Sequence, residues 1–190
     1  MVGLREKPVL VTGGTGFIGG RLAERLHLES HARVRVLVHR WASTTWISRY
    51  PVELVAGDVC DAAAVRAAAT GCSIVFHCAS GGDDADSYRA VNVDGTRNVL
   101  EAARHCGVER IVHLSSAVVH DLEAPGEIDE DSPLRPARHP YTASKIGGEE
   151  VVWEFWRRDR LPVTVIRPAF VWGPRGLQYT VAPIRAMAEG

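Results

Sequence analysis

The stretch VLVTGGTGFIGGRL, residues 9–22, begins like a buried strand, ends like a helix and contains five glycines. Gly14, Gly16 and Gly19 form the pattern GxGxxG, whereas Gly13, Gly16 and Gly19 form GxxGxxG, and the sequence leaves both registers open. Backbone without Cβ atoms lets a phosphate approach, and the amides at a helix start favour an anion. The stretch therefore predicts a dinucleotide-binding turn, with a glycine-rich turn that binds nothing as the alternative.

Short apolar runs alternate with helical patterns along the rest of the chain, which is typical of a parallel sheet covered on both faces. The runs predict strands at 8–12, 34–39, 52–56, 73–79, 110–115 and 163–169. Helices are predicted at 17–28, 62–69, 88–106 and 141–158. We expect an α/β protein with a doubly wound parallel sheet, a Rossmann fold, in the strand order 3-2-1-4-5-6.

After Ala169 the pattern thins to the loop FVWGPRG and one amphipathic stretch. We expect residues 1–170 to form a dinucleotide-binding domain. Residues 171–190 would then begin a C-terminal substrate-binding region that is largely absent from this sequence.

Composition narrows the class of protein. The 190 residues carry a net charge of -1 and are 46% hydrophobic, which fits one ordinary domain and gives no electrostatic footprint for nucleic acid or a membrane surface. Because the N-terminus runs almost directly into a predicted strand, we expect no signal peptide, and the four cysteines form no CxxC pair. We expect a cytoplasmic protein with reduced thiols and no metal site.

The end of the second predicted strand bears on the choice of dinucleotide. An acidic residue at that place binds the ribose 2′-hydroxyl of NAD, but here the strand reads VRVLVHR and ends in His39 and Arg40. A guanidinium pairs well with a 2′-phosphate. The sequence favours NADP over NAD, with an Arg40 that points to solvent as the alternative.

The stretch YTASK indicates a catalytic function, because its Tyr141 and Lys145 lie one helical turn apart. A nearby ammonium favours phenolate, so we expect Lys145 to lower the pKa of Tyr141 toward that of a general acid/base. Ser115 and Ser116 follow the fifth predicted strand, whose carboxyl end is where ligands bind in such sheets.

In these stretches the chain resembles the extended, epimerase/dehydratase-like branch of the short-chain dehydrogenase/reductase family. Seven stretches in family order carry the resemblance: TGGTGFIG, GDVCD, FHCAS, VNVDGTRNVLEAA, HLSSAVVH, YTASK and VIRPAFVWGP.

The resemblance implies roles for individual residues. Ser116 would orient the substrate, with Ser115 as the fallback, Tyr141 would be the acid/base, and Lys145 would bind the nicotinamide ribose. Contacts to the cofactor are further implied for the phosphate loop, the second-strand end, the adenine pair and five later positions: Gly13, Thr15, Gly16, Phe17, Ile18, Gly19, His39, Arg40, Asp58, Val59, Ala79, Ser80, Asn92, Ser115 and Pro168.

Several positions depart from the family pattern. His120 stands where sugar-nucleotide epimerases usually have tyrosine, and Ala117 and Val118 replace the Asp-Glu pair of dehydratases. Gly147 and Gly148 interrupt the catalytic helix, which indicates either close packing against another helix or a flexible helix. On the same helix, Trp153 and Trp156 are interpreted as core or dimer-interface residues rather than substrate contacts.

Three functions remain open at this stage. The leading hypothesis is an NAD(P)-dependent oxidoreductase that interconverts a secondary alcohol and a ketone. The alternatives are a sugar-nucleotide epimerase that oxidises its substrate transiently with bound NAD, and a non-catalytic NAD(P)-binding regulatory protein. The resemblance also implies a homodimer through helices 88–106 and 141–158.

Overall fold

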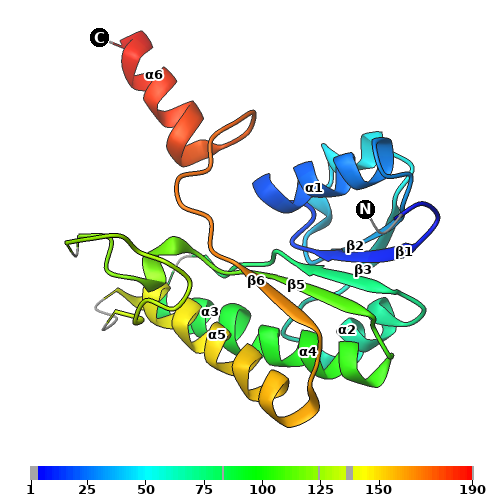
Figure 1. Ribbon diagram of the computed structural model, residues 1–190. Helices are drawn as coiled ribbons and strands as arrows, with labels where there is room; N and C mark the ends of the chain where they lie inside the picture. The colour runs from blue at the N-terminus through cyan, green and yellow to red at the C-terminus, as the bar shows by residue number, and fades with distance from the viewer. Residues whose placement is uncertain (1–3, 83, 124, 136–138, 190) are drawn as a thin grey trace.

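The computed structural model describes residues 4–82, 84–123, 125–135 and 139–189. Six parallel strands form one sheet in the order β3-β2-β1-β4-β5-β6, as predicted, and Figure 1 shows this sheet between helical layers. The strands are β1 (Pro8–Thr12), β2 (Arg33–Val38), β3 (Glu53–Ala56), β4 (Ile74–His77), β5 (Arg110–Leu114) and β6 (Val163–Ile166). Some end up to three residues earlier than predicted, the last at 166 rather than 169.

Helices cover the sheet from both sides. The helix α1 lies on one face, and α2, α4 and α5 lie on the other (Figure 1). The α-helices are α1 (Phe17–Leu28), α2 (Ala62–Ala69), α3 (Ala85–Arg89), α4 (Gly95–His105), α5 (Pro140–Asp159) and α6 (Ala182–Glu189). Strand residues alternate between two apolar clusters, because Leu10 packs on the α2 side while Val9 and Val11 pack on the α1 side.

The strand order reverses at β1, and this reversal places the site. The two neighbours of β1 run parallel to it, with Val9 opposite Val34 of β2 and opposite Ile74 of β4. Connections on the two sides of β1 run in opposite directions, which opens a crevice at the carboxyl ends of the strands, above the closely packed loops that follow β1 and β4.

The predicted helix 88–106 is wrong as a single helix. It consists of α3, a π-helical segment η3 (Ala90–Asp94) and α4. In contrast, α5 runs unbroken through its two glycines. A Cβ on Gly148 would lie 2.6 Å from the Asn92 carbonyl oxygen, and one on Gly147 would lie 3.0 Å from the Val93 side chain. Close packing of α5 on η3 within this chain accounts for both glycines.

After β6 the chain passes through a π-helical segment η5 (Leu177–Val181) into α6, which stands away from the sheet and buries none of its residues (Figure 1). The division at residue 170 stays a prediction. Among the described residues, no helix is long and apolar enough to cross a membrane, and no three potential ligands gather as a metal site would require.

Candidate active site

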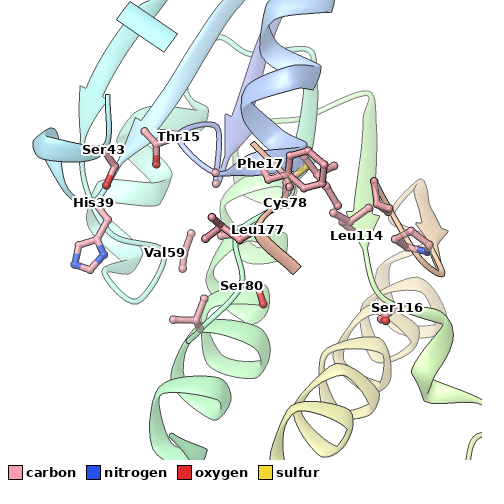
Figure 2. A pocket seen from close by; sticks show the side chains of 18 of the residues that line it. Thr15, Phe17, His39, Ser43, Val59, Cys78, Ser80, Leu114, Ser116 and Leu177 are labelled. Carbon is pink, nitrogen blue, oxygen red and sulfur yellow. The ribbon is translucent and has the colours of Figure 1, made fainter. Parts of the chain in front are cut away.

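A cavity of about 740 Å³ lies at the carboxyl ends of the strands, where the crevice opens. Figure 2 shows side chains from several elements around it, among them Thr15 after β1, His39 after β2, Val59 after β3, Ser80 after β4 and Ser116 after β5. Residues far apart in the sequence therefore share one cavity, whose size suits a small organic ligand or cofactor.

The glycine-rich turn forms one wall of this cavity. Gly13 has φ +68°, and a Cβ there would lie 2.6 Å from the Cys78 carbonyl group and the Ala79 nitrogen. The Gly16 amide donates to the Gly13 carbonyl at 3.0 Å and closes the turn before α1. Gly13 and Gly16 line the cavity, and the backbone needs glycine at Gly13 in particular, so the 13-16-19 register describes the turn better.

The other residues of the turn divide into lining and packing positions. Thr15, Phe17 and Ile18 also line the cavity. Gly19 does not, because it packs directly on the Gly13 carbonyl oxygen, where a Cβ would collide. We therefore assign Gly19 a supporting role rather than the direct cofactor contact implied by the resemblance.

Several polar side chains line the part of the cavity where β2 and β3 end. His39, Arg40, Asp58 and Val59 all line this part. The His39 Nε2 atom lies 3.2 Å from the Asp58 carboxylate, which also accepts the Cys60 amide at 2.9 Å. Arg40 is exposed and has no carboxylate within 4.0 Å in the part of the chain that the structure describes. Its guanidinium is thus available to an anion.

The loop after β4 and the end of β6 complete the wall. Ala79, Ser80 and Pro168 line the cavity, whereas Asn92 does not. Asn92 is buried in η3, where its side chain accepts the Gly81 amide at 3.0 Å and donates to Ser144 Oγ at 2.8 Å. It joins the β4 loop to α5 and so positions the wall instead of forming it.

The predicted catalytic side chains meet at the cavity. Ser116, Tyr141 and Lys145 all line it. The helix α5 begins with Pro140 at its first turn, so Tyr141 and Lys145 lie one turn apart at its start. The Lys145 ammonium donates to the Leu114 carbonyl at 3.2 Å and lies 5.8 Å from the centre of the Tyr141 ring.

Burial governs the protonation of this pair. It lowers the pKa of Lys145 to about 8 and raises the pKa of Tyr141, while the Ser116 hydroxyl beside the phenol lowers the latter. The expectation that Tyr141 has a lowered pKa is wrong, because desolvation is the largest influence on the phenol, and the Lys145 ammonium, which donates to a backbone carbonyl, is not among the groups that shift it. Tyr141 is a neutral phenol at neutral pH.

The two serines after β5 have different surroundings. Ser116 caps a short 3₁₀ turn, η4 (Ala117–Val119), by accepting the Val118 amide at 3.5 Å. Ser115 Oγ is buried, and no described residue forms a hydrogen bond of good geometry with it. It nevertheless lies near the Glu149 carboxyl and helps to lower the pKa of that group. Ser116 is the better candidate for a substrate contact, because its hydroxyl is beside Tyr141.

Some lining residues were missed by sequence reasoning. Cys78 lies under the turn, and burial raises the pKa of its thiol to about 12, so it is not a nucleophile. The segment after β6 contributes Arg175, Leu177 and Tyr179. No periodic pattern marks this segment, and only the loop stretch WGPRG could have drawn attention to it.

Comparisons with known proteins agree with this geometry. The chain is 34% identical over 177 residues to a 3 beta-hydroxysteroid dehydrogenase/Delta 5-->4-isomerase of Mycobacterium tuberculosis, covering 87% of this chain and 47% of that protein. Among solved structures, DesIV, a dTDP-glucose 4,6-dehydratase of Streptomyces venezuelae with NAD bound, superimposes with a TM-score of 0.83 at 28% identity, over 96% of this chain and 63% of that one.

A UDP-glucuronic acid 4-epimerase of Bacillus cereus in complex with NAD gives a TM-score of 0.77 at 26% identity, over 88% of this chain and 58% of that one. The chain spans about half the length of the curated relatives it matches. A model of the NAD dependent epimerase/dehydratase family matches residues 9–190. The chain therefore belongs to this family, whose members are NAD-dependent epimerases, dehydratases and dehydrogenases of the extended short-chain dehydrogenase/reductase type.

Proposed function

We propose that this chain binds a nicotinamide dinucleotide and interconverts a secondary alcohol and a ketone. One observation carries the proposal: Ser116, Tyr141 and Lys145 line the same cavity as the glycine-rich turn. A phosphate-binding turn and an acid/base group in one crevice are the two parts that such a reaction needs.

The residues of the cavity fit a dinucleotide. Gly13 and Gly16 line the cavity without side chains, so the backbone is open to a phosphate there, and the amides at the start of α1 favour an anion. Arg40 and Tyr141 both line the cavity, and Figure 2 shows their neighbours His39 and Ser116 on opposite sides of it. When bound, the dinucleotide supplies the group that accepts or donates hydride.

The chain itself orients the substrate and moves the proton. Ser116 would donate a hydrogen bond to the substrate oxygen. In reduction, the neutral Tyr141 phenol would give its proton to that oxygen, and in oxidation the phenolate would take it back. Lys145, whose pKa is about 8, is mostly an ammonium at neutral pH and would bind the ribose next to the nicotinamide, the role that the resemblance implies.

The preferred cofactor in this proposal is NADP. Arg40 lines the cavity without a carboxylate partner among the described residues, and a 2′-phosphate is its natural ligand. An Arg40→Ala variant should lose affinity for NADPH about tenfold or more while its affinity for NADH stays within twofold. Equal loss for both dinucleotides would exclude a 2′-phosphate role.

Epimerisation is the second candidate, because the Bacillus cereus neighbour is a 4-epimerase solved with NAD. An epimerase keeps its oxidised cofactor through turnover, so tightly held NAD after purification would favour this reading over free exchange. Dehydration is disfavoured, since Ala117 and Val118 offer no carboxylate beside Ser116.

The test of the main proposal uses Tyr141→Phe. Assayed with NADPH against a panel of ketones, the wild-type chain should show turnover, and the variant should lose about 10²–10⁴-fold in rate while it still binds NADPH. Tyr50→Phe is the control, because the Tyr50 hydroxyl bonds Glu24 away from the cavity. Activity that survives Tyr141→Phe would refute the mechanism, and binding without any turnover would favour the regulatory protein.

A further inference from the structure

Arg175 reaches the glycine-rich turn from the far end of the chain. It lies between β6 and η5 and lines the cavity, half-buried. Its Nη2 atom donates to the Thr15 carbonyl at 3.3 Å, across 160 positions of sequence. Its φ of +73° shows that the backbone bends sharply here. A guanidinium therefore lies directly beside the turn that we expect to hold a diphosphate.

The position of this guanidinium is set by its surroundings. Its Cζ atom lies 5.1 Å from the centre of the Trp46 ring, a cation–π contact. A Cβ on Gly20 would come within 3.3 Å of Nη1, so the glycine leaves room for the side chain against α1. The aromatic ring, the carbonyl and the helix surface hold the side chain on three sides.

The charge of Arg175 has no carboxylate partner among the residues that the structure describes. In the described ranges, no carboxylate lies within 4.0 Å of it, and the one acidic residue lining the cavity, Asp58, is paired with His39. A guanidinium has five N–H donors, and a single hydrogen bond to Thr15 leaves most of them free. An anion with several oxygens, such as a diphosphate, matches this set of donors.

We propose that Arg175 is a further cofactor-binding residue that donates hydrogen bonds to the diphosphate of the dinucleotide. The inference rests on the proposed function, because it needs the dinucleotide to lie on the turn. It gives the segment after β6 a defined part in binding: the cation closes the side of the diphosphate that the backbone amides leave open.

The experiment compares three single variants of the whole chain. Arg175→Gln removes the charge, Arg175→Lys keeps the charge but not the fork, and Arg185→Gln removes an exposed charge on α6 that does not line the cavity. Dissociation constants are measured for NADPH by calorimetry and for adenosine, which has no phosphate, by NMR.

Arg175→Gln should weaken NADPH binding about tenfold to a hundredfold and leave adenosine binding within twofold. Arg175→Lys should lose less, and Arg185→Gln should match the wild type. Equal NADPH affinity in Arg175→Gln and wild type, or equal loss for NADPH and adenosine, would overturn the inference alone. If the wild-type chain binds neither NADPH nor NADH, the proposed function fails and the inference fails with it.

Discussion

Replacing Gly13 with alanine should destabilise the protein through two separable effects. Its φ of +68° lies in the left-handed region, where a Cβ costs about 1–2 kcal/mol. The same Cβ would also lie 2.6 Å from backbone atoms of Cys78 and Ala79, which cannot rotate away. Forcing that shift costs roughly 1–3 kcal/mol more. We expect a total loss of about 2–5 kcal/mol in the free energy of unfolding, a large share of a typical 5–15 kcal/mol.

Gly71 provides the matched control. Its φ is +75°, but a Cβ there would meet no heavy atom within 4 Å. Gly71→Ala should therefore lose only the backbone share, about 1–2 kcal/mol. Urea unfolding followed by circular dichroism gives both values from midpoints at equal slope. Equal losses in the two variants would refute the close approach of the β1 and β4 loops on which the cavity depends.

Three further changes test other parts of the structure. The pKa of Lys145 is about 8 in the folded protein against 10.5 in an unfolded chain, so between these pH values the folded state binds fewer protons and its stability rises with pH. Lys145→Met, compared with wild type by urea unfolding from pH 7 to 10.5, should flatten this rise in stability. Parallel curves for the two proteins would contradict the burial of Lys145. Glu149 is fully buried and accepts two hydrogen bonds of 2.9 and 2.7 Å from Arg167, so Glu149→Gln should cost about 3–5 kcal/mol of unfolding free energy. Glu29→Gln, in the exposed pair with Arg25, should cost far less, and similar losses in the two variants would show that burial of the pair is unimportant. The resemblance implies a homodimer through helices that include α4 and α5, and Trp156 is 43% exposed on α5. If the chain dimerises there, Trp156→Glu should shift sedimentation toward monomer, while an unchanged dimer would place the interface elsewhere.

The arrangement of the sheet and the place of the cavity could be predicted from the sequence because the apolar runs, the glycine-rich turn and the handedness of the crossovers all indicate the same fold. Each apolar run is long enough for one buried strand, and right-handed crossovers leave few possible orders. The glycine-rich turn and YTASK then follow strands whose ends meet at one edge. The sequence alone therefore predicts that residues near these strand ends, such as Ser116 and Tyr141, lie close together.

Other features depend on contacts between segments that are distant in the sequence, and no short sequence pattern indicates them. The π-helical break at residues 90–94 goes with Asn92, whose side chain bonds Gly81 and Ser144. Nothing in the sequence distinguishes Arg175 from other loop arginines, because its contact with Thr15 exists only in the folded chain. The pKa of Tyr141 follows from burial by several elements, which the spacing of a Tyr-Lys pair does not contain.

A crystal structure of this chain with bound NADPH tests the central claim most directly. The account predicts diphosphate oxygens within hydrogen-bonding distance of the amides between Gly13 and Phe17, and the nicotinamide ring beside Tyr141 and Lys145. A dinucleotide bound outside this cavity, or a Tyr141 hydroxyl directed away from the nicotinamide, would contradict it.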